Sequence, residues 1–107
     1  MANPIRGEVQ LKAGESTYTL LLNTNAVCAL EGKLDMGIAD IMAKMGRMSV
    51  LRALLWASLL ERHTIAKPED VGPIMDEAGA DAVVEAINRA ATLAFSKSDA
   101  ATARKNR

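Results

Sequence analysis

The sequence has very few aromatic, cysteine and histidine residues. Its 107 residues include one tryptophan, one tyrosine, one phenylalanine, one cysteine and one histidine. The core must therefore be built from leucine, isoleucine, valine, alanine and methionine. A lone cysteine cannot form an intramolecular disulfide, which suits a reducing compartment. A structural zinc site needs four nitrogen or sulfur ligands, and Cys28 and His63 alone cannot supply them.

The chain also lacks net charge and a long apolar run. Its 13 basic and 13 acidic side chains cancel, so no overall field attracts nucleic acid or an anionic membrane. The most apolar stretch, residues 50–60, is shorter than the about 20 residues that a membrane-spanning helix needs. No apolar segment of a signal peptide follows the first residues. We therefore expect a soluble, cytoplasmic protein without a membrane partner.

Residue patterns that carry catalysis are missing as well. Gly32-Lys33 has neither the spacing nor the preceding strand of a phosphate-binding loop. Glu69 and Asp70 are adjacent, and neighbouring side chains on a helix point in different directions, so they do not form an acid–base pair. Cys28 has no basic neighbour to generate a thiolate, and we expect a packed or half-buried thiol. The sequence predicts a protein that is not an enzyme and uses no cofactor and no metal.

The stretch over residues 49–63 organises the rest of the chain. Between residues 50 and 60 only Arg52 and Ser58 are polar. A helix that is apolar on nearly all sides must be surrounded by protein. We predict a buried central helix with Ser49 as its N-cap. It should continue to about His63, whose imidazole would interact with the helix dipole.

Residues 5–22 predict a β-hairpin. Apolar side chains alternate with polar ones on both sides of a turn around Gly14, a residue that tolerates positive φ. The apolar positions are Ile5, Val9, Leu11, Tyr18, Leu20 and Leu22. A hairpin of two strands is barely stable alone in water, so this apolar face must lie on helices.

Helical periodicity accounts for most of the remaining chain, over about residues 25–97. Besides the central helix, we predict helices over about residues 26–34, 38–45, 70–78 and 81–97. Gly46 should end the second of these, and Asp70 and Asp81 should cap the last two, with Pro73 in a first turn. The fold class is therefore α+β, an N-terminal β-hairpin packed on a mainly α-helical bundle of about five helices. Residues 1–97 form a single domain, and residues 98–107 a disordered basic tail.

Methionines cluster between residues 36 and 48 and suggest a contact surface. Methionine adapts to irregular surfaces and is over-used where one surface accepts varied partners. Met36 and Met48 lie next to turns, and with Arg47 and Arg52 they are our candidate partner-binding residues. The alternative is that Met42 and Met45, which have helical spacing, simply belong to the core.

A nucleic-acid-binding role is the weaker alternative. Residues 38–45 and 49–63 have roughly the lengths of a helix-turn-helix motif. A recognition helix must expose polar side chains to base edges and phosphates, however, and the second of these helices has almost none. The few cations of residues 98–107 would bind a phosphate backbone weakly and in a salt-sensitive way.

Three stretches resemble one known family. They are MANPIRGEV (residues 1–9), YTLLLNTNAVCALE (residues 18–31) and LRALLWASL (residues 51–59). They are similar to the tail assembly chaperones of gene transfer agents and tailed phages, which are also labelled gene transfer agent tail tube proteins. The likeness extends more loosely to about Phe95.

The resemblance implies a chaperone that binds the tape measure protein while tail tube subunits polymerise around it, and that then leaves the particle. Contacts with the major tail tube protein and self-association remain open. Two alternatives also remain: a structural tail component retained in the particle, and a small nucleic-acid-binding regulator. The family resemblance assigns no individual functional residue.

Overall fold

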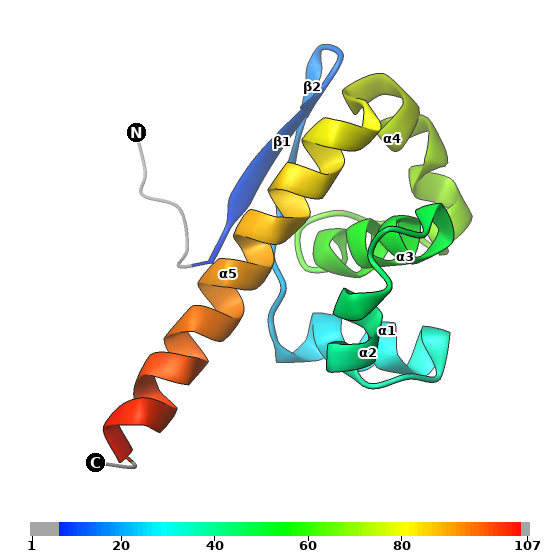
Figure 1. Cartoon of the computed structure of the whole chain (residues 1–107). Helices are drawn as coiled ribbons and strands as arrows, with labels where there is room; N and C mark the ends of the chain where they lie inside the picture. Colours follow the sequence, from blue (N-terminus) through cyan, green and yellow to red (C-terminus); the bar gives the residue numbers. More distant parts are fainter. Residues whose placement is uncertain (1–6, 106–107) are drawn as a thin grey trace.

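In the part of the chain that the structure describes, a two-stranded hairpin and five α-helices form the fold (Figure 1). The computed structural model describes the backbone of residues 7–105 and the side chains of residues 7–95. The elements are β1 (Val9–Ala13), β2 (Ser16–Leu20), α1 (Thr24–Leu34), α2 (Ile38–Ala43), α3 (Met48–Leu59), α4 (Gly72–Ala78) and α5 (Ala80–Lys105), with a 3₁₀ turn over Pro68–Val71. The predicted α+β class is confirmed. No helix within the described residues is both long and apolar enough to cross a membrane.

The hairpin is antiparallel, with Val9 opposite Leu20 and Ala13 opposite Ser16. Gly14 begins the two-residue turn with a φ of +63°, a value that glycine adopts at little cost. Alternate side chains of β1 are buried against α4 and α5, as the period of two predicted. β1 starts at Val9, later than expected, and Ile5 lies outside the described residues.

The central helix α3 is buried along most of its length, as the sequence predicted. Leu54, Leu55, Ala57 and Leu59 have no exposed surface. α3 contacts α1, α5, β2 and the 3₁₀ turn, so it is surrounded by protein on most sides. Ser58, a polar residue in this helix, is fully buried and satisfies its hydroxyl by donating to the Leu55 carbonyl at 2.9 Å. This burial also argues against a DNA-reading surface on α3.

Both ends of α3 differ from the prediction. The helix begins at Met48 after Arg47, and no side chain caps it, so Ser49 is not the N-cap. It ends at Leu59, and His63 lies beyond the helix in the following loop. There the imidazole bonds to the hairpin, because its Nε2 accepts a hydrogen bond from the Thr19 amide at 3.0 Å. The predicted dipole role of His63 is therefore wrong.

This loop protects the outer edge of β2. The amides of Thr19 and Leu21 point away from β1, and they donate to His63 Nε2 and to the Ser58 carbonyl at 2.8 Å. Arg62 adds an ion pair to Glu8 at 2.6 Å. An edge strand with free amides can pair with other chains. The two hydrogen bonds from Thr19 and Leu21 satisfy amides on this edge and so oppose such pairing.

Replacing His63 with phenylalanine should destabilise the hairpin edge. The ring contact with Tyr18, at 5.4 Å between centroids, can persist, but the partly buried Thr19 amide loses its acceptor at a cost of about 1–3 kcal/mol. Amide hydrogen exchange should accelerate at Thr19. The Leu20 amide points toward β1 because successive amides alternate along a strand, so its exchange should change much less. Unchanged exchange at Thr19 would contradict the hydrogen bond between its amide and His63.

Other helix boundaries also differ from the predicted ones. α2 ends at Ala43 instead of Met45. Asp70 lies within the 3₁₀ turn, where its side chain accepts from the Lys67 amide, and α4 starts after it at Gly72 with Pro73 in the first turn. α5 begins at Ala80, so Asp81 lies inside its first turn and is not the cap.

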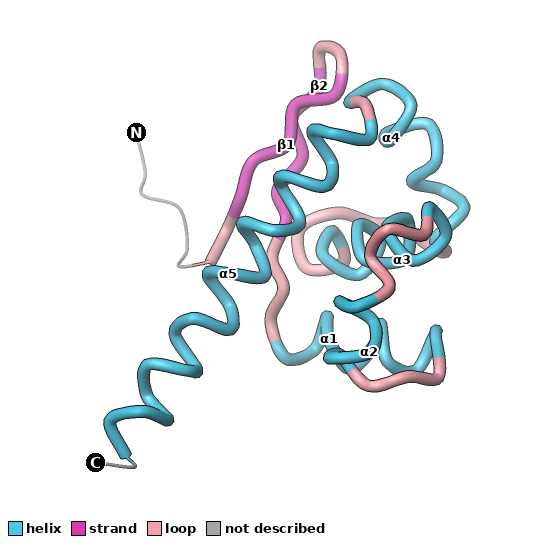
Figure 2. The backbone as a smooth tube through the Cα atoms, in the orientation of Figure 1, coloured by secondary structure: helices cyan, strands magenta, loops and turns pink. Residues whose placement is uncertain are grey.

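α5 also extends beyond the predicted domain end. The sequence predicted disorder over residues 98–107, whereas the helix continues to Lys105; residues 106–107 lie outside the described part. Alanine is frequent over residues 100–103, and its high helix propensity favours a helix even without an apolar face. Figures 1 and 2 show the last turns of α5 projecting away from the other elements.

Candidate partner-binding surface

Met48 is the most exposed large apolar side chain among the described residues. It is 59% exposed and occupies the first position of α3. Arg47 precedes it and is also exposed. Both residues were selected from the sequence, and the structure places them on the molecular surface, where a partner could reach them. A single exposed methionine beside a cation is an accessible contact point, not a groove.

The other two predicted residues are less accessible. Met36, in the loop between α1 and α2, is half-buried and packs against the core. Arg52 is half-buried one turn beyond Met48, and i,i+4 spacing puts the two on the same side of α3. Met42 and Met45, which were expected in the core, are also half-buried against it. The assignment of all four partner-binding residues stays a prediction.

An unsatisfied polar pair lies on the same side of α3. The Arg52 Nε and the Trp56 Nε1 atoms are buried and have no hydrogen-bond partner. The Lys33 ammonium lies 5.4 Å from the centroid of the Trp56 ring, within the range of a cation–π interaction. The Lys33 ammonium thus lies against a tryptophan that is only 7% exposed. Neither buried atom can contact a partner without rearrangement.

Candidate chemistry elsewhere is sparse. Within residues 7–95, no group of three or more histidine, cysteine, aspartate and glutamate side chains is arranged to hold a metal ion. Cys28 is exposed on α1, which corrects the predicted packed or half-buried thiol. The helix turns this residue outward because Ala26 and Leu30 occupy the buried side.

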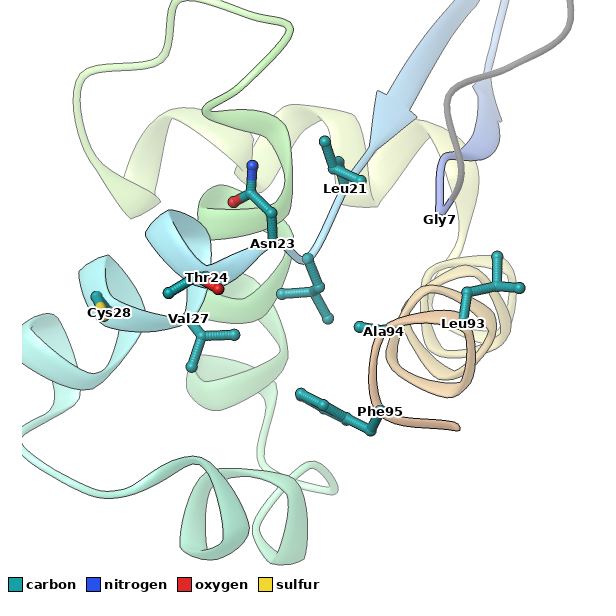
Figure 3. Close-up of a pocket in the computed structure, with 10 residues that line it drawn as sticks. Gly7, Leu21, Asn23, Thr24, Val27, Cys28, Leu93, Ala94 and Phe95 are labelled. Carbon is teal, nitrogen blue, oxygen red and sulfur yellow. The ribbon is translucent and has the colours of Figure 1, made fainter. Parts of the chain in front are cut away.

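A groove that sequence reasoning missed lies between the base of the hairpin, α1 and α5. It has a cavity volume of about 340 Å³, and Figure 3 shows its lining. We call it the hairpin-base groove. Its apolar lining includes Leu21, Val27, Leu93, Ala94 and Phe95, with Gly7 and Cys28 also on its wall. A signal for Leu93 exists in the sequence: it is a large apolar residue that lies off the side of α5 on which Val83, Ile87 and Ala90 are buried.

Compared with protein-family models, with curated proteins and with solved structures, the chain matches none of them.

Proposed function

We propose that this chain is a non-enzymatic tail assembly chaperone of a phage-like gene transfer agent. In this role it binds the tape measure protein in the cytoplasm while the tail tube assembles. The support comes from the three stretches at residues 1–9, 18–31 and 51–59 that resemble this family. Contacts with the major tail tube protein and with further copies of the chain are compatible with this role.

One structural observation carries the choice of contact point. Met48 is 59% exposed although apolar, and it lies beside the exposed Arg47. An amphipathic helix of a partner could cover the thioether and place an acidic side chain near the guanidinium. The tape measure protein is the partner that the family resemblance suggests.

The experiment is co-expression of a tagged form of this chain with the tape measure protein of the same gene cluster. We expect the tape measure protein to become soluble and to co-purify. Persistent insolubility, with the tagged chain eluting alone, would count against the chaperone role. Presence of the chain in purified particles would instead favour a retained structural component, and salt-sensitive DNA binding a regulator.

Replacing Met48 with aspartate should weaken this complex about tenfold to a hundredfold, because burying a methionine contributes about 1.5–3 kcal/mol. The variant should fold normally, since an acidic residue in the first turn of a helix interacts favourably with its dipole. Met48→Leu is the matched control and should retain the partner. Equal binding by both variants would mean that the partner does not contact Met48 and binds another surface of the protein.

A further inference from the structure

The hairpin has two outer edges, and His63 and Ser58 cover the one along β2. In an antiparallel pair, two residues opposite each other either exchange hydrogen bonds or both turn their amides and carbonyls outward. The Thr19 amide points outward to His63, and Thr19 lies opposite Gln10. Gln10 therefore turns its own amide and carbonyl toward the other edge of the hairpin, the outer edge of β1. Lys12, two residues further along the strand, does the same.

This outer edge of β1 is open in the part of the chain that the structure describes. Gln10 and Lys12 are exposed, and no hydrogen bond among the described residues uses their outward amides. α4 and α5 pack on the buried face of β1, while α3 contacts β2. Figure 1 shows β1 on the side of the hairpin away from α3. Outward amides and carbonyls along a strand are a template on which another strand can pair.

The residues of β1 match a second copy of the same strand in one antiparallel register. When Gln10 lies opposite Gln10 of the second copy, Lys12 of each chain lies opposite Glu8 of the other. The outward amides of one strand then meet the outward carbonyls of the other. On the buried face, Val9 lies beside Leu11 of the second copy, so apolar side chains stay on the side that the helices cover.

Charge favours this register over its neighbours. Lys12 takes part in no ion pair within the described residues. Glu8 pairs with Arg62 at 2.6 Å, and a carboxylate has further acceptor positions for a lysine from an adjacent strand. A register that placed Lys12 opposite Lys12 would bring like charges together. Lysine on an edge strand often prevents pairing, but here it opposes some registers and favours the one that places it opposite Glu8.

We propose that two copies of this chain pair through the outer edges of β1 and form a four-stranded antiparallel sheet with Gln10 at its twofold axis. The helices that cover β1 then lie on the same face of the joined sheet in both copies. An extended segment of another protein would meet the same open edge, but the self-complementary charges favour a second copy. The proposal does not rest on the chaperone function, because its tests read this chain alone.

The first test follows the full chain by sedimentation and by amide hydrogen exchange over a wide range of protein concentration. We expect the mass to rise from one chain to two, and exchange at Gln10 and Lys12 to slow several-fold as the dimer forms. The Leu11 amide points toward β2 in both states, so its exchange should change much less. A monomer at the highest concentration would overturn the proposal, as would a dimer in which Gln10 and Lys12 exchange as fast as in the monomer.

The second test compares Gln10→Pro with Gln10→Ala. Proline removes the outward amide but no bond between β1 and β2, and an edge strand tolerates proline at such a position. We expect Gln10→Pro to weaken dimerisation at least about tenfold, because the lost hydrogen bond counts once in each copy. Gln10→Ala keeps the amide and should still form the dimer. Circular dichroism and cooperative unfolding check that both variants fold, and equal dimerisation by both would overturn the proposal.

The third test distinguishes the proposed register from a lysine that merely prevents pairing. Lys12→Glu places two carboxylates opposite each other on both sides of the twofold axis, and we expect it to weaken dimerisation about tenfold or more. Lys12→Gln removes the charge without reversing it and should weaken dimerisation only a few-fold. Stronger dimerisation by Lys12→Gln than by the unaltered chain would show that the lysine opposes pairing, and it would overturn the proposal.

Discussion

Replacing Leu54 with alanine should lower the free energy of unfolding by about 2–5 kcal/mol. Leu54 has no exposed surface and lies in the middle of α3, the helix that contacts four other elements. Truncation removes apolar burial and leaves a cavity that these elements cannot easily fill. Because domains of this size have a total stability of about 5–15 kcal/mol, the loss is a large part of the whole. Urea unfolding followed by the fluorescence of the single tryptophan would measure it.

Met48→Ala is the matched control on the same helix. Met48 is 59% exposed, and substitutions at such surface positions usually stay within about 0.5 kcal/mol. Similar losses in the two variants would mean that α3 is not buried as described. A small loss for Leu54→Ala alone would mean that the surrounding helices collapse into the cavity.

The elements of the fold could be predicted from periodicity because burial imposes it. The apolar run over residues 50–60 demands surrounding protein, and the alternation from Val9 to Leu11 demands one covered face. Both features are present in the structure. A lone hairpin needs helices against its face, and that physical need led directly to the α+β arrangement.

Element ends and side-chain contacts were harder to predict because they depend on residues distant in sequence. Ser49 has the chemistry of an N-cap, yet α3 begins one residue earlier. His63 bonds to Thr19, 44 residues away, and no local pattern encodes that distance. The hairpin-base groove likewise joins Gly7, Val27 and Leu93 from three segments. Only the assembled fold brings such residues together.

Replacing Trp56 with alanine should have an effect as large as the loss of Leu54. The side chain is 7% exposed and belongs to the core cluster. Its truncation should cost about 3–5 kcal/mol in the free energy of unfolding. It also removes the ring that faces the Lys33 ammonium. Because the fluorophore is lost, unfolding has to be followed by circular dichroism.

The Trp56→Phe variant separates the contribution of the indole N–H from that of the aromatic ring. The indole N–H is buried without a hydrogen-bond partner, so removing it forfeits no bond, while the phenyl ring keeps most of the burial and a weaker cation–π contact. We expect a loss clearly smaller than that of Trp56→Ala, because the phenyl ring leaves a smaller cavity. A loss for Trp56→Phe close to that of Trp56→Ala would mean that the space left by the missing part of the indole costs nearly as much as removing the whole side chain.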